Sequence, residues 1–482
     1  MNELIAYIAP AAPELFVFAG ACLLLVIDVF LPASRRDVTY WLAQALLAGA
    51  IVVTWQGLDG ATAHAYHHMY VTDRLAELLK LVIYGLTMFA FAYSRDYLRA
   101  RDMYRGEYFV LALFAVLGMM VMASAANFLT LYLGLELLSL SLYAMIALRR
   151  DSAEATEAAM KYFVLGAIAS GVLLYGLSLV YGMTHSLDIA TLRQALTAKP
   201  MGDNMVLILG LVFVLSAIAF KLGAVPFHMW VPDVYHGAPT SVTLFLGTAP
   251  KVAGFALVAR LLLEGFEPLS ASWQPILILM AVLSMGLGNL LAIAQTNIKR
   301  MLAYSSISHM GFFLLGVLSL GPNGYSSALF YMLVYAVMSL AGFGVILLMS
   351  RAGMEAENIS DFKGLNQRSP WFAFLMLLVM FSMAGVPPLA GFYAKFLVIQ
   401  AVVKSDMLWL AIVAVLFAVI GAYYYLRVIK VMYFDEPDDK SPVTGSGPFR
   451  VLLSINALAL LAVMPVVGWV IELCRRVIGG TY

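Results

Sequence analysis

The chain has 482 residues, of which 63% are hydrophobic and only 12% charged, and its formal net charge is +1. Soluble domains carry about twice that share of charged residues, so the composition excludes a soluble enzyme, a nucleic-acid-binding protein and a disordered chain. Apolar runs fill almost the whole length, which indicates an all-α polytopic membrane protein. Cys22 and Cys474 lie near opposite ends, so they predict neither a disulfide framework nor a thiolate metal site.

Membrane-spanning helices set the first expectation. A span needs about 20 mostly apolar residues, which predicts about fourteen spans here. Long apolar runs without strand-type alternation favour helices over a barrel. The expected spans are residues 13–31, 39–56, 75–94, 107–124, 127–148, 159–182, 204–231, 240–263, 273–295, 299–320, 324–350, 370–403, 407–433 and 449–474.

Basic residues are divided unevenly between the two sides of this arrangement. The links after the first, third, fifth, ninth, eleventh and thirteenth spans hold more than twice as many Lys and Arg residues as the other side. Basic residues are enriched in cytoplasmic loops. We therefore expect those links to be cytoplasmic and both termini to face outward.

Basic residues near the ends of the expected spans, Arg260 among them, are assigned to the links. Five basic residues are then left over, and all of them are lysines: Lys80, Lys161, Lys221, Lys251 and Lys395. A buried lysine can lose its proton, whereas arginine stays charged. The pattern therefore indicates groups that take up and release protons. The alternative is snorkelling to the interface, which applies most to Lys80 and Lys161 because they lie near the starts of their spans.

Glu136 is the one acidic residue deep in an expected span. Tyr132, Ser139 and Tyr143 share its helix face, and such a polar stripe should face the bundle interior or water. Because an unpaired buried carboxylate is costly, we expect a lysine partner. A structural ion pair that pins two helices is the alternative.

Other polar residues are candidates of a second kind. Lys251 lies among small residues, which would bring its ammonium close to a neighbouring span. His309 is mid-span and is a candidate proton relay, since histidine titrates near neutral pH; a hydrogen-bonded core histidine is the alternative. His64, His67 and His68 lie in an external link without a carboxylate or cysteine nearby, so we interpret them as a solvated loop rather than a metal site.

Two expected spans are interrupted by proline, at Pro226 and at Pro387 and Pro388. Proline breaks a helix, and exposed backbone at membrane depth is tolerated only inside protein or beside water. Paired breaks in corresponding halves indicate an inverted repeat with an ion site. The expected division is residues 1–106 for three N-terminal helices, 107–263 and 264–433 for two inverted five-helix units with broken seventh and twelfth helices, and 434–482 for a C-terminal helix.

Two long motifs resemble a known family. Residues 225–240 read Val-Pro-Phe-His-Met-Trp-Val-Pro-Asp-Val-Tyr-His-Gly-Ala-Pro-Thr, and residues 295–311 run from Gln-Thr-Asn-Ile-Lys-Arg to Ser-His-Met-Gly. Both resemble signatures of the proton-conducting, antiporter-like subunits of respiratory complex I, the proton-translocating NADH:quinone oxidoreductase. The similarity covers nearly the whole chain.

The resemblance implies a set of roles. By motif position, Glu136, Lys221, Lys251 and Lys395 would transfer protons, and Glu136 and Lys221 would form a pair whose coupling changes during pumping. In the family picture His309 would relay protons with Lys251, and Lys161 also matches a family position.

The resemblance also implies partners and a location. The chain would hold no cofactor or metal, while NAD, FMN, iron–sulfur clusters and quinone would bind in partner subunits. Those partners would be antiporter-like subunit M, the small subunits A, J and K and, through them, the peripheral arm, in a bacterial inner membrane. One alternative is a subunit of a multi-subunit Na⁺/H⁺ antiporter or a membrane-bound hydrogenase, and another is a structural spacer that conducts nothing.

Overall fold

The computed structural model describes residues 8–58, 62–198, 204–350, 353–443, 445–462 and 464–480. Within these ranges the chain is almost entirely helical. The one sheet described is an antiparallel hairpin of β1 (Ala63–Ala65) and β2 (Tyr70–Thr72). The terminal residues, to which the prediction of outward-facing ends refers, lie outside the described ranges.

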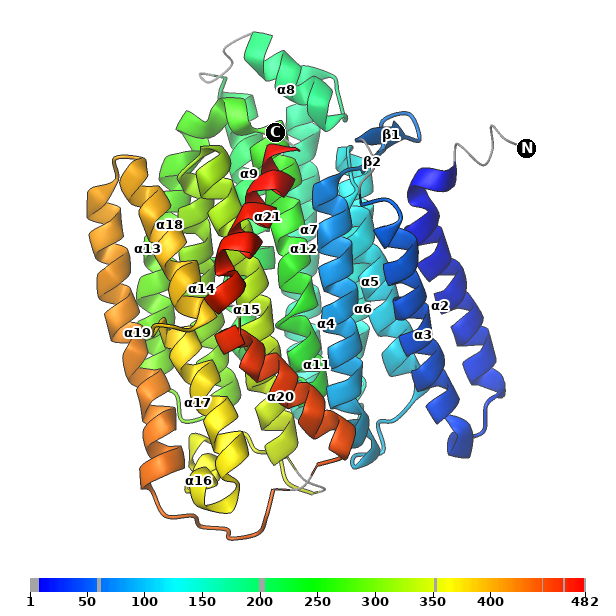
Figure 1. Cartoon of the computed structure of the whole chain (residues 1–482). Helices are drawn as coiled ribbons and strands as arrows, with labels where there is room; N and C mark the ends of the chain where they lie inside the picture. The colour runs from blue at the N-terminus through cyan, green and yellow to red at the C-terminus, as the bar shows by residue number, and fades with distance from the viewer. Residues whose placement is uncertain are drawn as a thin grey trace.

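Upright helices form the bundle (Figure 1). The long uninterrupted helices are α2 (Ala12–Phe30), α3 (Asp37–Trp55), α4 (Arg74–Arg99), α5 (Gly106–Ala123), α6 (Phe128–Ile146), α7 (Ala153–Thr184), α9 (Met205–Leu222), α13 (Ser270–Ala294), α14 (Ile298–Leu318), α15 (Gly321–Met349) and α19 (Leu408–Phe434). The divided spans contain α11 (Thr240–Leu246), α12 (Ala249–Val258) and the π-helix η3 (Ala259–Gly265), then α17 (Pro370–Ala384) and α18 (Ala390–Lys404), and finally α20 (Gly447–Ala462) and α21 (Val467–Gly479). The short helices are α8 (Ile189–Ala198), α10 (Trp230–Gly237), α16 (Leu365–Arg368), η1 (Ala9–Ala11), η2 (Ala33–Arg35), η4 (Glu267–Leu269), η5 (Ile359–Phe362) and η6 (Met464–Val466).

The number of spans agrees with the expectation of a polytopic helical protein. Twelve described helices are long and apolar enough to cross a membrane, and the bent pair α20–α21 would make thirteen. The twelfth expected span is absent from that count because it is divided into α17 and α18, of 15 residues each. At 1.5 Å per residue, neither half alone reaches across about 30 Å of hydrocarbon.

The last expected span, residues 449–474, departs from the prediction of a single straight helix. Helices α20 and α21 meet at 87°, and Figure 1 shows α20 lying obliquely below the upright α21. Pro465 lies in the short turn η6 between them. Because proline cannot continue the hydrogen-bond ladder of a helix, it accounts for the change of direction.

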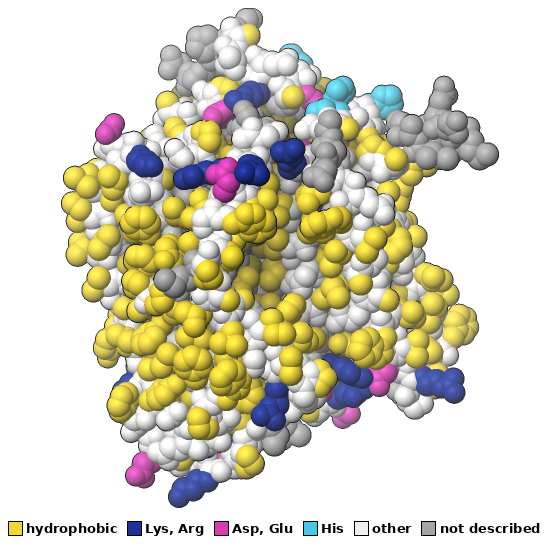
Figure 2. Space-filling model, viewed as in Figure 1, with side chains coloured by type: hydrophobic (Ala, Val, Ile, Leu, Met, Phe, Trp, Pro, Cys, Tyr) yellow, Lys and Arg dark blue, Asp and Glu magenta, His cyan; other side chains and the backbone are white. Residues whose placement is uncertain are grey.

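A belt of apolar side chains surrounds the middle of the molecule. Figure 2 shows this belt between two ends at which the Lys, Arg, Asp and Glu side chains gather. In Figure 1 the start of α2, the hairpin, α8 and the end of α21 lie at one end, which we call the hairpin end, and α16 lies at the other. This arrangement is that of a multi-pass membrane protein.

Glycine allows two helix pairs to pack backbone against backbone. A Cβ atom on Gly118 of α5 would lie 2.6 Å from the Leu138 amide nitrogen of α6. A Cβ atom on Gly288 of α13 would lie 2.6 Å from the Ser308 amide nitrogen of α14. Small residues are what permit such close approach in membranes.

Asparagine caps the second helix of each of these pairs. Asn127 precedes α6 and accepts a hydrogen bond from the Leu129 amide, and Asn297 precedes α14 and accepts one from the Arg300 amide. Each asparagine also forms an isolated antiparallel bridge, Asn127 with residue 188 and Asn297 with residue 358. The first link lies beside the hairpin, through a bridge between residues 70 and 125, and the second lies near α16 at the opposite end.

Substitution of Gly118 by valine should destabilise the bundle. The new side chain would meet the α6 backbone, which cannot move as a side chain could, and overpacking of this kind costs about 1–3 kcal/mol. Thermal unfolding of the solubilised protein would report the loss. Gly171→Val is the control, because a Cβ atom on Gly171 of α7 would have no atom within 4 Å. Equal stability of the two variants would contradict the packing argument.

Candidate proton-transfer site

The two predicted helix breaks are confirmed. Helix α9 ends at Leu222 and α17 ends at Ala384, and each is followed by a glycine in the left-handed conformation, Gly223 at φ 76° and Gly385 at φ 91°. Glycine is the residue that adopts this conformation without a steric penalty. The predicted prolines follow within the breaks, before α10 and α18 begin.

A buried lysine binds the end of each first half-helix. The Lys251 ammonium donates to the Leu222 carbonyl at 2.6 Å. The Lys395 ammonium donates to the Met383 and Ala384 carbonyls, both at 2.9 Å. The last carbonyls of a helix lack partners within the helix and form the negative end of its dipole. The two lysines, which are only 3% and 8% exposed, therefore satisfy these carbonyls.

The glycine at each break leaves room for the ammonium. A Cβ atom on Gly223 would lie 3.7 Å from Lys251 Nζ, and one on Gly385 would lie 3.6 Å from Lys395 Nζ and 2.9 Å from Lys395 Cδ. The two lysines thus occupy the same position relative to their breaks. Lys251 arrives from the following span, as its small-residue surroundings predicted, whereas Lys395 arrives from the second half of the same span.

Glu136 and Lys221 lie close together but form no direct ion pair in the described structure. The Ser170 hydroxyl of α7 donates to the Glu136 carboxylate and lies 3.1 Å from the Tyr132 hydroxyl. The Lys221 ammonium donates to the Ser139 hydroxyl at 2.8 Å. The expected lysine partner of Glu136 is therefore replaced by serine. Since Ser139 follows Glu136 by about one helical turn, the Lys221 ammonium of α9 lies against the face of α6 that carries Glu136.

His309 is hydrogen-bonded on both ring nitrogens. Nδ1 lies 2.6 Å from the Tyr331 hydroxyl and Nε2 lies 3.1 Å from the Tyr425 hydroxyl. The Tyr425 hydroxyl in turn lies 2.5 Å from the Ser305 hydroxyl. This geometry fits the alternative of a satisfied core histidine. It also places His309 in a continuous row of groups that can each donate and accept a hydrogen bond.

Lys161 is not brought to this site. Its ammonium lies 2.8 Å from Glu157 and 2.8 Å from Asp233, its side chain is 43% exposed, and Arg300 contacts the same Asp233 at 2.8 Å. This is an ion cluster on the surface. The position of Lys161 in its apolar run did not show this, because Asp233, which joins Lys161 to Arg300, comes from α10.

Lys80 does not follow the alternative interpretation, in which its side chain would snorkel to the membrane interface. It is fully buried and lies 2.9 Å from Glu14 and 3.2 Å from Glu77. Glu136 is therefore not the only acid in the helical interior. Arg260, which the sequence analysis assigned to a link, is also buried, at 1% exposed. Sequence reasoning missed this cluster because Glu14 and Arg260 lie near the ends of their apolar runs.

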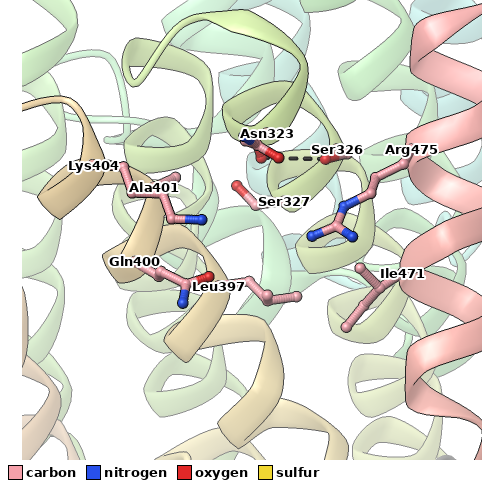
Figure 3. Close-up of a pocket in the computed structure, with 9 residues that line it drawn as sticks. All are labelled: Asn323, Ser326, Ser327, Leu397, Gln400, Ala401, Lys404, Ile471 and Arg475. Atoms are coloured by element: carbon pink, nitrogen blue, oxygen red, sulfur yellow. Dashed lines mark hydrogen bonds between the residues drawn. The ribbon is translucent and has the colours of Figure 1, made fainter.

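A small polar pocket opens along α18, the helix that carries Lys395 (Figure 3). Its polar lining comes from three helices: Asn323, Ser326 and Ser327 of α15, Gln400 and Lys404 of α18, and Arg475 of α21. Lys404 follows Lys395 by nine residues, which is about 14 Å along a helix. The pocket therefore lies between the end of the bundle and the depth of Lys395.

The model of a family described as NADH:quinone oxidoreductase/Mrp antiporter, transmembrane, matches residues 125–421. That range is more than half of the chain and includes every lysine and glutamate of the site. The chain belongs to this antiporter family.

Among the described residues, no group of three or more His, Cys, Asp or Glu side chains is placed to hold a metal ion.

Named relatives within the antiporter family are similar over almost their whole length. NADH-quinone oxidoreductase subunit N of Thioalkalivibrio sulfidiphilus is 60% identical over 94% of each chain. Subunit N of Thiobacillus denitrificans is 56% identical over 98% of each chain.

Solved structures of the antiporter family share the fold. Respiratory complex I from Thermus thermophilus with bound aureothin contains a chain with a TM-score of 0.82 and 29% identity, covering 95% of this chain and 98% of that one. A chain of an archaeal membrane-bound sulfane sulfur reductase has a TM-score of 0.88 and 25% identity over 98% of this chain and 97% of that one. The Mrp complex from a Dietzia species, at 21% identity and TM-score 0.85 over 97% of each chain, shows the fold alone.

Substitution of Gly385 by alanine should impair the site without removing a charge. The methyl group would enter the space of the Lys395 side chain and displace its ammonium from the α17 carbonyls. It would also strain the backbone by about 1–2 kcal/mol. Gly321→Ala is a matched control, because Gly321 has φ 68° but nothing within 4 Å of the place a Cβ atom would take. We expect membrane-potential formation to fall for Gly385→Ala only; equal effects would assign the defect to backbone strain.

Proposed function

We propose that the chain is a proton-translocating membrane-arm subunit of an NADH:quinone oxidoreductase. The observation that carries the proposal is the pair of buried lysines, Lys251 and Lys395, each seated on the carbonyl end of a broken helix. Long relatives that are 51–60% identical and named subunit N support the choice of enzyme.

The arrangement of these lysines suits proton transfer. Burial disfavours the charged ammonium, while the half-helix carbonyls favour it, so the two states of each lysine are balanced against one another. A change in a nearby charge can then shift the balance. Glu136 and Lys221 supply such a charge pair at one side, and the His309 hydroxyl row lies toward Lys395.

Two inverted five-helix units, residues 107–263 and 264–433, are part of the proposal. The capped links at Asn127 and Asn297, at opposite ends of the bundle, support the inversion. So do the matching glycine–lysine breaks. Residues 1–106 and 434–482 would flank the two units.

The energy for transport comes from partner subunits. NAD, FMN, iron–sulfur clusters and quinone would be bound there, and this chain would be a non-redox subunit of the translocating enzyme. The partners are antiporter-like subunit M, small subunits A, J and K and, through them, the peripheral arm. The location is a bacterial inner membrane with both termini periplasmic. An Mrp-type subunit is disfavoured, because the relatives named subunit N are 51–60% identical to this chain, whereas the Mrp chain is 21% identical.

Substitution of Lys395 by alanine tests the proposal directly. The group that takes up the proton is removed, so NADH oxidation and membrane-potential formation should fall together in membranes containing equal amounts of assembled enzyme. Lys363→Ala is the control, since Lys363 pairs with Asp438 on the surface. Full activity and full potential with Lys395→Ala would remove this lysine from the proton path.

Substitution of Glu136 by glutamine tests the charge pair of Glu136 and Lys221. The amide retains an acceptor for Ser170 but removes the charge that faces Lys221, so pumping should be lost while assembly is kept. Glu472→Gln on the exposed surface of α21 is the control. Potential formation at the wild-type level would reduce Glu136 to a packing role.

A further inference from the structure

A buried ionic cluster at the hairpin end of the N-terminal helices is not used by the function proposed above. The Lys80 ammonium of α4 lies 2.9 Å from Glu14 of α2, 3.2 Å from Glu77 of α4 and 3.0 Å from the Tyr70 hydroxyl of β2. Tyr70 donates to Glu14 at 2.7 Å. On the next turn of α4, the Tyr84 hydroxyl lies 3.3 Å from Thr54 of α3.

The charges in this cluster do not balance. One ammonium faces two carboxylates, and Glu14 and Glu77 are only 6% and 2% exposed. The Oε2 atom of Glu77 accepts no hydrogen bond from any described residue. Because an uncompensated buried charge is costly, one proton shared by the two carboxyl groups would balance the charge of Lys80.

A second group of the same composition adjoins it. Asp73 caps α4 one turn before Glu77, and the Arg260 guanidinium contacts both Asp73 oxygens at 2.8 and 2.9 Å. Arg260 also contacts Glu264. Arg260 thus contacts two acids, while Arg193, which pairs with Glu267, lies beside them. Arg260 and Glu264 lie on the π-helix η3, a wide helical turn that is frequent at functional sites.

The second group opens into a cavity. Asp73, Arg260 and Glu264, together with His64 and Arg193, line a cavity of about 210 Å³ at the hairpin end. That volume holds several water molecules. Since both Asp73 and Glu264 line it, water there can reach the carboxyl group on either side of Arg260.

We propose that Glu14, Glu77, Asp73 and Glu264 form a proton-exchange site that connects the helical interior to the outward side of the membrane. A carboxyl O–H bond breaks at Glu77 and an O–H bond forms on Asp73, one turn earlier on α4. That bond breaks in turn when the proton passes to water in the cavity that Asp73 and Glu264 line, and the proton leaves to bulk water. Lys80 and Arg260 are positioning residues that hold the carboxylates. The inference rests on the proposed function and gives the N-terminal helices, outside the two five-helix units, a part in it.

The link to the relay residues is a single helical span. Lys251 lies in α12, and Arg260 follows it by nine residues on the continuous run from α12 into η3, about 14 Å along. Movement of α12 with the state of Lys251 would therefore reach the exchange site directly.

Glu77→Gln in the complete enzyme, reconstituted in vesicles, tests the site. We expect normal assembly, loss of proton translocation per NADH oxidised, and a rate of NADH oxidation that no longer responds to the pH of the outward compartment. Glu77→Asp should restore both. Glu355→Gln is the control, because Glu355 contacts Tyr97 at the opposite end of α4 and Arg101 just beyond that end. Wild-type translocation and pH response in Glu77→Gln would overturn the proposal.

A variant without the three charges of the first cluster guards against failure to assemble. Glu14→Gln, Glu77→Gln and Lys80→Met combined remove the whole first cluster, and replacing a complete buried ion pair is often neutral for stability. If this variant assembles and pumps like the wild type, the cluster is structural and the proposal fails. If it assembles without pumping, the proposal stands. Normal pumping in Lys395→Ala would instead sink the proposed function itself, so the two failures are distinguishable.

Discussion

The hydrogen bonds from lysine to the carbonyl end of an interrupted helix are the interaction on which the rest of the structure depends. An open helix end inside a membrane leaves carbonyls that water cannot reach. A lysine at the same depth needs acceptors for its protons. Each solves the problem of the other, which is why Lys251 and Lys395 lie over Leu222 and Ala384. The left-handed glycine and the prolines serve the same interaction, because they end the helix at the place where the lysine ammonium binds its carbonyls.

The sequence predicts those features of the site that depend on neighbouring residues in the chain. Proline acts on its own helix turn, so the breaks at Pro226 and Pro387 could be located from the sequence. The depth of Lys395 followed from counting residues along its apolar run. Both are local properties, and the structure agrees with them.

Pairing between helices could not be predicted in the same way. The partner of Lys221 is Ser139 rather than Glu136, and Lys161 turns to Asp233 at the surface. Lys80 and Arg260 find acids that are far away in sequence. Which helices become neighbours decides these contacts, and apolar periodicity does not encode it. The bend between α20 and α21 was missed because a single proline in a long apolar run was counted as part of one span.

The glycine contacts between helix backbones restrict how such a bundle can move. At Gly118 and Gly288 no side chain separates the two helices, and each glycine packs directly against a backbone amide of the facing helix. Sliding one helix past the other would force each glycine past a bulkier neighbour. The helix pairs α5–α6 and α13–α14 therefore behave as rigid units. Conformational freedom is left to segments outside these two pairs, such as the divided spans, and to side chains that reach across. Transport would then depend on ångström-scale rearrangements rather than on movement of whole domains.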